Sequence, residues 1–513
     1  MSFEHGRRTV ISTDKGKLRG YRKNGIYHYF NIPYAKAERF LAPVEAEAWD
    51  GVKEATSYGY IAKQMMPEII GDDLATPHRF YPQSEDCLNL NVWTPGVDDA
   101  KRDVIVWFHG GGFFAGSSIE QVAYDGYNLA KRGNVVVVTV NHRLNLLGYL
   151  DLRKYGEKYI HSVNAGNLDL VAALRWVKRN IERFGGNPES VTVFGQSGGG
   201  GKVISLMNMP SACGLFHKAM IMSGTLGDFL SDEGVDTSSI VETFLKKLNL
   251  NKDNIEEIES LDYSVLTKAY REANAECGIA GPPFFAPQRG VDYLGDPMHV
   301  GFSEFAKGVP VIIGSTFAEF SSLKGKTDRF AKESAVYPYV KEMFHEGVDC
   351  VLEKFEKAFP EKKMVDVLTY DADVFRLGSI EYAKKRVAEG CAPTYLYLFC
   401  PTMKLNESSM PMHCADIPYV FANTDLVAAS DIGRATRRLE KEIVERFVHF
   451  AHTGDVNCEN YPEWNECKEG ETYTYLYQET CEQRCNFDED LLREMKQWKK
   501  PFSFAENLEK EEK

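Results

Sequence analysis

Residues 190–201 read Ser-Val-Thr-Val-Phe-Gly-Gln-Ser-Gly-Gly-Gly-Gly, an apolar run that ends at a serine flanked by glycines. The β-branched run at 191–194 predicts a buried strand, and the residues after Gly199 predict a helix. Ser197 then lies on the tight turn between them, the G-x-S-x-G nucleophile elbow, where Gly195 and Gly199 leave room for the chain to reverse. The alternative is a glycine-rich turn that only packs a helix on a sheet, and partners for Ser197 decide between the two.

Five more apolar runs lack the alternation of a half-exposed strand, namely residues 104–108, 135–140, 219–222, 309–313 and 395–399. Such runs are typical of parallel strands covered by helices on both faces. A helical pattern at 168–184, closed by Gly185 and Gly186 as a C-terminal cap, lies between two of them. Strands that alternate with helices predict an α/β fold with a mostly parallel central sheet flanked by helices.

The remaining segments extend this sheet into one domain, predicted to span residues 1–505. Turn signals at 9–60 predict antiparallel hairpins at one edge, and a helix at 437–452 and a strand at 473–477 complete the fold. Amphipathic helical segments at 228–305 and 322–390 interrupt the alternation. We expect them to be insertions over the carboxyl end of the sheet, where α/β folds bind ligands. Residues 506–513 form a charged tail.

Composition restricts the partners and the location. The 513 residues carry a net charge of -14, which argues against nucleic acid and anionic membranes. No apolar run approaches the roughly 18 residues of a membrane helix, and residues 1–8 lack the apolar segment of a secretory signal. The eleven cysteines are scattered, which favours free thiols, and the C-terminal ones miss the zinc spacings. We therefore expect a cytoplasmic protein without a metal or another cofactor.

A serine nucleophile needs a base, and a carboxylate to orient that base. With a nucleophile elbow the chain order is Ser, then Asp or Glu, then His, which leaves His345, His413, His449 and His452. His449 and His452 fall in the helix predicted at 437–452, and His345 lies in a charged helical stretch. His413 follows the strand predicted at 395–399 in a proline-punctuated loop, so we predict it as the base.

The carboxylate should follow an earlier strand. Glu319 comes six residues after the run at 309–313, beyond the turn Gly314-Ser315, and is the first candidate. Without the other motifs it would read as one surface acid among 74. Asp416 ranks second, because it lies only three residues from His413 and follows it in the chain.

A third motif offers a place for negative charge. Residues 109–113, His-Gly-Gly-Gly-Phe, follow the strand predicted at 104–108. Glycines let backbone N–H groups converge on the oxyanion of a tetrahedral intermediate. We predict Gly111 and Gly112 as donors, with the N–H of Gly198 as the third. A merely flexible loop is disfavoured by its position directly after a buried strand.

Several stretches resemble the signatures of one enzyme family. Residues 84–95, Ser-Glu-Asp-Cys-Leu-Asn-Leu-Asn-Val-Trp-Thr-Pro, are similar to one of two signature motifs of that family. Residues 194–199, Phe-Gly-Gln-Ser-Gly-Gly, are similar to the other, which contains its serine. Residues 176–186 and 450–454 fit as well. The chain thus resembles, nearly end to end, the type-B carboxylesterase family of α/β-hydrolases, and within it the bacterial para-nitrobenzyl-esterase-like branch. The resemblance implies an α/β-hydrolase fold, with the triad Ser197, Glu319 and His413 and the oxyanion donors Gly111, Gly112 and Gly198.

The chain departs from the family pattern at a few places. Gln196 and Gly198 stand where the family usually has Glu and Ala, a change that leaves the mechanism intact. Secreted members bridge the equivalent of Cys87 to an upstream cysteine, but residues 1–86 contain none, which supports a reducing compartment. Cholinesterases carry a cation-binding tryptophan shortly before the signature that corresponds to residues 84–95. This chain has no tryptophan between Trp49 and Trp93, so no choline-type site is expected.

Together these residues predict a serine hydrolase that cleaves small-molecule carboxylic esters through an acyl-enzyme, as a monomer or small homo-oligomer. Two alternatives stay open: a non-catalytic binding protein on the same scaffold, as the family's adhesion branch implies, and a hydrolase that prefers amides, thioesters or lactones. Adhesion relatives commonly lose a triad residue and carry membrane stalks, and this chain shows neither feature. Four aromatic residues predict either an apolar pocket or core packing: Phe113, Phe114, Phe317 and Phe320.

Overall fold

The computed structural model describes residues 2–65, 75–225, 237–278, 285–323 and 327–499. The charged tail predicted at 506–513 lies outside the described residues, as do parts of both predicted insertions.

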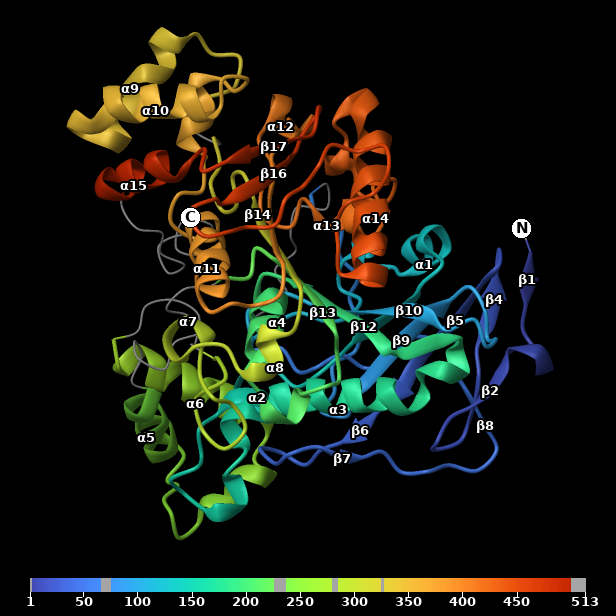
Figure 1. Cartoon of the computed structure of the whole chain (residues 1–513). Helices are drawn as coiled ribbons and strands as arrows, with labels where there is room; N and C mark the ends of the chain where they lie inside the picture. Colours follow the sequence, from blue (N-terminus) through green and yellow to red (C-terminus); the bar gives the residue numbers. More distant parts are fainter. Residues whose placement is uncertain (1, 66–74, 226–236, 279–284, 324–326, 500–513) are drawn as a thin grey trace.

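A twelve-stranded sheet forms the centre of the molecule (Figure 1). Its strands, in spatial order, are β1 (Phe3–Glu4), β4 (Tyr21–Lys23), β5 (Ile26–Pro33), β9 (Asn89–Thr94), β11 (Val136–Val140), β10 (Arg102–Phe108), β12 (Gly186–Gln196), β13 (Lys218–Met222), β14 (Val311–Thr316), β15 (Thr394–Phe399), β16 (Tyr473–Tyr477) and β17 (Glu482–Cys485). Neighbours from β11 to β16 run parallel, whereas the four strands at the first edge, and β17 at the other, pair antiparallel.

Two small sheets lie beside the central one. They are formed by β2 (Val10–Ser12), β3 (Lys17–Arg19) and β8 (Val52–Glu54), and by β6 (Ala35–Lys36) and β7 (Val44–Glu45).

The predicted parallel sheet and its antiparallel edge are therefore confirmed. The largest shift of a boundary at the start of a core strand is in β12, which begins at Gly186 rather than at 191. The strand predicted at 309–313 is found at Val311–Thr316. Pro310 explains this later start, because a proline has no N–H to donate to the neighbouring strand.

Helices cover both faces of the sheet (Figure 1). Alternate side chains of β10 enter different cores: Val106 and its neighbours two residues away pack with one set of helices, Ile105 and Trp107 with the other. The first set contains α3 (Ala165–Asn180), α4 (Gly198–Met207) and α11 (Arg376–Ala388); the second contains α1 (Tyr127–Gly133), α13 (Ile417–Val420) and α14 (Thr436–Thr453). This two-sided burial is why the strand sequences are apolar without alternation.

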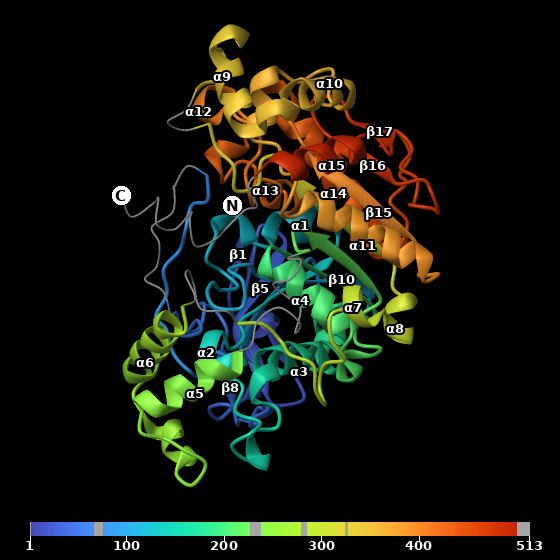
Figure 2. The ribbon, with the colours of Figure 1, turned by 90° about the vertical axis from the view of Figure 1, so that its left-hand side faces the viewer.

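The remaining helices lie mostly in two connections. Between β13 and β14 the described residues form α5 (Thr237–Lys247), α6 (Tyr263–Glu276), α7 (Pro297–Val300) and α8 (Glu304–Lys307). Between β14 and β15, α9 (Glu333–Phe344) and α10 (Val348–Ala358) precede α11, and Figures 1 and 2 show them at the opposite end of the molecule from α5 and α6. The other helices are α2 (Asn145–Tyr149), α12 (Leu405–Ser408) and α15 (Glu489–Trp498). The division into one domain with two insertions stays a prediction.

Within the described ranges, none of the helices combines the length and the apolarity that crossing a membrane requires.

A buried ion pair ties α11 to the C-terminal part of the chain. Arg376, the first residue of α11, donates to both carboxylate oxygens of Asp488, at 2.6 and 2.9 Å. Its side chain also donates to the hydroxyl of Thr474 on β16. Both charged side chains are almost completely buried. The residue just before this helix, Phe375, stacks on the imidazole of His413, so the pair also helps to fix a side chain of the site described below.

We expect Arg376→Met to lower the free energy of unfolding by about 3–5 kcal/mol, because it leaves Asp488 as a buried charge without its ion-pair partner. Urea unfolding of the purified protein measures this loss. Adding Asp488→Asn to the same variant removes the stranded charge and should restore part of the stability. An unfolding midpoint that is unchanged in Arg376→Met would contradict the prediction.

Candidate active site

Ser197 lies between the end of β12 at Gln196 and the start of α4 at Gly198. Its backbone is left-handed, with φ 58° and ψ -128°, a conformation that costs a serine free energy. Its N–H donates to the carbonyl of Met222, at 2.8 Å. A Cβ added at Gly195 would lie 2.4 Å from the carbonyl carbon of Gly199, so the turn requires glycine there. The predicted elbow is present, with the serine at its tip.

The glycine loop after β10 packs directly on this elbow. A Cβ added at Gly198 would lie 2.1 Å from the carbonyl oxygen of Gly112, and one at Gly110 would lie 3.4 Å from the Cβ of Ser197. Gly111 and Gly112 both have a positive φ, at 80° and 60°. The fold thus brings the predicted oxyanion donors together beside Ser197.

The loops that carry Glu319 and His413 are joined through their backbones. Glu319 and Met412 form an isolated parallel β-bridge. The N–H of His413 donates to the carbonyl of Glu319 at 2.9 Å, and that of Ala318 to the carbonyl of Pro411, also at 2.9 Å. These backbone bonds hold the two loops together independently of the contact between the Glu319 and His413 side chains.

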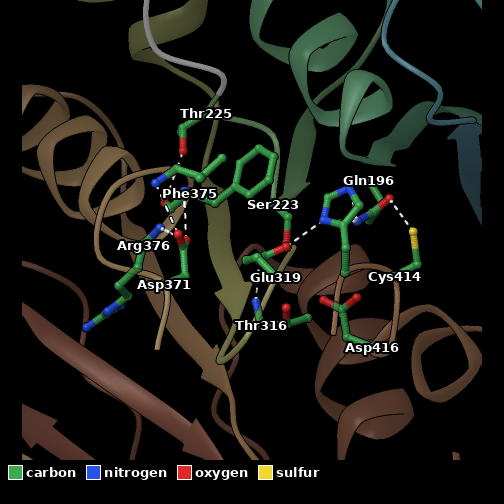
Figure 3. A network of polar contacts seen from close by, with 12 residues as sticks. Gln196, Ser223, Thr225, Thr316, Glu319, Asp371, Phe375, Arg376, Cys414 and Asp416 are labelled. Atoms are coloured by element: carbon green, nitrogen blue, oxygen red, sulfur yellow. Dashed lines mark hydrogen bonds and ion pairs between the residues drawn. The ribbon is translucent and has the colours of Figure 1, made fainter. Parts of the chain in front are cut away.

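The Glu319 carboxylate is buried and fully engaged. Its Oε2 accepts from Nδ1 of His413 at 2.5 Å. Its Oε1 accepts from the hydroxyl of Ser223 and from the N–H of Thr316, each at 2.7 Å. Figure 3 shows Glu319 between Ser223 and Thr316. Three donors therefore hold the carboxylate in place against one nitrogen of the imidazole.

The His413 ring is held by its surroundings. Nε2 of the Gln196 amide lies 3.2 and 3.3 Å from its two ring nitrogens, which places the amide over the ring face. Phe320 and Phe375 pack on the ring, with centroids 4.3 and 5.2 Å away. Within the described part of the chain, the side-chain polar contacts of this ring are with Glu319 and Gln196, and the Ser197 hydroxyl is not among them.

Several residues around Ser197 have strained backbone conformations. Besides Ser197, three residues of the site have a left-handed φ without being glycine: Ser223, Glu319 and Cys414, at 44°, 40° and 72°. Each such residue costs on the order of 1–3 kcal/mol and persists only where the surrounding structure enforces it. The thiol of Cys414 donates to the amide oxygen of Gln196 at 3.2 Å, a contact drawn in Figure 3.

The other candidates of the sequence lie elsewhere. Asp416 accepts from the hydroxyl of Tyr397 at 2.7 Å, and Nδ1 of His413 donates to Glu319 instead. His449 and His452 lie on α14, as predicted. His345 lies in a 3-10 turn where α9 gives way to α10, with φ 48°, rather than inside a continuous helix.

The four aromatic residues divide between the two expectations. Phe113 and Phe317 are buried core residues, the latter packed against Phe359 and its neighbours. Phe114 lies against Gly112, where an added Cβ would meet its ring at 2.6 Å. Phe320 contacts the ring of His413. The two that contact the site are thus Phe114 and Phe320.

The sequence reasoning missed Ser223 and Phe375. Ser223 follows β13 directly, and its place at the carboxyl end of a core strand was a signal that could have been used. Phe375 had no such signal, because it reaches His413 only through the packing of α11.

Comparison with known proteins shows the family to which this chain belongs. Residues 7–491 match the carboxylesterase family. The para-nitrobenzyl esterase of Bacillus subtilis is 33% identical over 476 residues, which cover 89% of this chain and 93% of that protein.

Two solved structures are similar along nearly the whole chain. An esterase from the anaerobe Clostridium hathewayi, described as able to hydrolyse aliphatic aromatic polyesters, is 42% identical with a TM-score of 0.92 and covers 97% of this chain and 99% of its own. The carboxylesterase of Geobacillus stearothermophilus is 31% identical with a TM-score of 0.73, covering 96% of this chain and 100% of its own.

The predicted α/β-hydrolase fold is confirmed by these structures. With a family match over nearly its full length, the chain belongs to the carboxylesterase family and is a carboxylic-ester hydrolase.

Proposed function

We propose that Ser197 is the nucleophile of this hydrolase, His413 its general base and Glu319 the carboxylate that orients the base. The observation that carries the proposal is the 2.5 Å hydrogen bond between Glu319 and His413, next to the strained elbow. Gln196, the residue before Ser197, touches the imidazole, so base and nucleophile are neighbours. A hydroxyl is a weak nucleophile at neutral pH and needs such a base.

In the proposed cycle, His413 takes the hydroxyl proton through Nε2 as Ser197 Oγ attacks the ester carbonyl carbon. The carbonyl π electrons move onto oxygen, and the tetrahedral intermediate collapses to an acyl-enzyme as the alcohol leaves with the proton from His413. Water then repeats the sequence and releases the acid. Glu319 keeps Nδ1 protonated and stabilises the imidazolium that forms twice in each turnover.

The N–H groups of Gly111, Gly112 and Gly198 would bind the negative oxygen. A peptide group is planar, so a bond to the carbonyl of one residue also fixes the N–H direction of the next. The carbonyl of Gly111 accepts from the N–H of Ala115 at 3.0 Å, and that of Ser197 from the N–H of Gly201 at 3.0 Å. The donors Gly112 and Gly198 are therefore held in place before a substrate arrives, which is what electrostatic stabilisation of an oxyanion requires.

Asp416 is the less suitable orienting group. Burial first of all, with a further contribution from the negative charge of Glu319, raises the pKa of Asp416 from 3.8 to about 7. One of its oxygens, Oδ1, is buried without a hydrogen-bond partner in the described structure. A carboxyl group that resists ionisation orients an imidazolium poorly, so Glu319 takes this role.

We also propose a cytoplasmic location, which the free state of all eleven cysteines supports. The substrate class is proposed as small carboxylic esters. Amides, thioesters and lactones of matched size are the competing substrates in the assay below.

We expect Ser197→Ala to abolish hydrolysis of a graded series of para-nitrophenyl acyl esters, because no other group at the elbow can form the acyl-enzyme. Release of para-nitrophenol by the purified protein measures this. Ser211→Ala is the matched control, since its buried hydroxyl has no hydrogen-bond partner among the described residues. Turnover by Ser197→Ala would end the proposal, and faster cleavage of the thioester or amide series would reassign the substrate.

We expect Gly111→Ala to slow ester hydrolysis by roughly 10²- to 10³-fold, the usual cost of losing one oxyanion donor. The new Cβ would lie 2.4 Å from the carbonyl oxygen of Ala115 and force the loop to move. Gly390→Ala is the control, since its φ of 67° imposes similar strain with nothing within 4 Å of the added atom. Equal rates in the two variants would count against the oxyanion assignment.

We expect Asp416→Asn to weaken the pH dependence of stability. Between pH about 4 and 7 the folded chain holds a proton on Asp416 that the unfolded chain has released, so stability falls as the pH rises through this window. Asparagine cannot ionise, and the variant should gain stability relative to the parent from pH 4 to pH 8. Urea midpoints across this range, with the exposed Asp425→Asn as control, measure the difference. Parallel pH profiles for all three proteins would refute it.

A further inference from the structure

A buried lysine lies beneath the glycine loop. Lys202 is on α4, five residues after Ser197, and its side chain is fully buried. Helical side chains tilt toward the helix N-terminus, so the ammonium reaches back toward the end of β10. Its path is open because residues 198–201 are all glycine. Nζ donates to the carbonyl of His109, the first residue of the loop, at 2.9 Å.

The surroundings of this ammonium are mostly uncharged. The imidazoles of His109 and His142 are stacked at 5.0 Å, and burial first, then the charge of Lys202, lower their pKa well below the usual value. The carboxyl group of Glu120, whose own pKa is raised by burial to about 7, acts on Lys202 by its charge. Nζ also lies 5.7 Å from the centre of the Phe113 ring.

Placing a lysine here costs stability. Burying an ammonium without a close ion pair is unfavourable, and burial lowers the pKa of Lys202 to about 7. Among the described residues, its hydrogen-bond acceptor is the His109 carbonyl. A methionine would fill the same space without this cost. The lysine is therefore better explained by its hydrogen bond to the His109 carbonyl than by a contribution to the stability of the fold.

The held carbonyl begins a chain of fixed peptide groups. Lys202 binds the carbonyl of His109, which fixes the peptide that follows. Nδ1 of the same histidine bonds the carbonyl of Gly110 at 2.9 Å, which fixes the direction of the Gly111 N–H. The carbonyl of Gly111 is held in turn by Ala115, which fixes the Gly112 N–H. Rotation of the His109 backbone would displace the imidazole and, through Gly110, the first oxyanion donor.

We propose that Lys202 is a positioning residue for the oxyanion site: its hydrogen bond to His109 sets the loop so that the N–H groups of Gly111 and Gly112 point at the substrate oxygen. The inference rests on the proposed function, because the direction of the Gly111 and Gly112 N–H groups matters only if they bind the oxyanion. Lys202 itself does not touch the substrate.

The test compares two inhibitors of the same shape. An alkyl trifluoromethyl ketone is attacked by Ser197 Oγ: a C–O bond forms, the carbonyl π pair moves onto oxygen, and the hydroxyl proton passes to His413. The matching methyl ketone resists this addition and binds as the neutral carbonyl. If the N–H groups of the glycine loop no longer point at the oxyanion, the affinity for the trifluoromethyl ketone should fall. The affinity for the methyl ketone should not change, because only the trifluoromethyl ketone adduct carries an oxyanion.

In Lys202→Met we expect kcat/KM for para-nitrophenyl esters and the affinity for the trifluoromethyl ketone to fall together, by about 10²-fold. The affinity for the methyl ketone should stay within about twofold. Lys218→Met is the matched control: Lys218 is also buried, on β13, and donates to the hydroxyl of Ser190 at 3.2 Å. It should lose stability without changing either affinity.

Folding of the variant is checked by thermal unfolding. If Lys202→Met does not fold, the double variant Lys202→Met with Glu120→Gln, which also replaces the carboxyl group that acts on the ammonium, is measured instead. A folded variant with unchanged kcat/KM and ketone affinity would overturn the proposal, as would equal losses for both ketones or failure of both variants to fold. Activity in Ser197→Ala would instead overturn the proposed function, so the two failures are distinguishable.

Discussion

The close approach of backbone to backbone at the elbow is the constraint on which the rest of this structure depends. Gly198 and Gly112 lie so near each other that a side-chain carbon at Gly198 would overlap the Gly112 carbonyl oxygen. This contact presses the first turn of α4 against the end of β10. Two peptide segments that are far apart in sequence thereby lie together beside Ser197, where we propose that their N–H groups bind the oxyanion.

The parallel sheet supplies the remaining partners by its geometry. The carboxyl ends of β12, β13, β14 and β15 lie next to one another, and the chain leaves them at Ser197, Ser223, Glu319 and the loop of His413 in that order. The loops are then joined by hydrogen bonds of their own, such as the one between the backbones of Glu319 and His413. The resulting strain at three of these residues is affordable because the sheet beneath them is buried on both faces.

Much of the fold was predictable from the sequence, because burial on both faces leaves an apolar run without alternation and the strands from β10 to β15 carry that mark. The glycine motifs were predictable for a similar reason, since close approach of backbones excludes side chains. Boundaries were less predictable: β12 begins earlier than its apolar run, and β14 begins only after Pro310. The junction at His345 shows the same limit, because a left-handed residue between two helices leaves no mark in their amphipathic pattern.

By itself, the sequence determined the order of strands and helices, the elbow at Ser197 and the glycine loop, because these depend on residues close together in the chain. It could only rank Glu319 above Asp416 by chain order. Tertiary structure decided which carboxylate meets His413, gave Glu319 the hydroxyl of Ser223, and placed the ammonium of Lys202 under the His109 carbonyl. These contacts join residues about 90 or more positions apart, and their distances follow from the packing of whole elements, which no local pattern encodes.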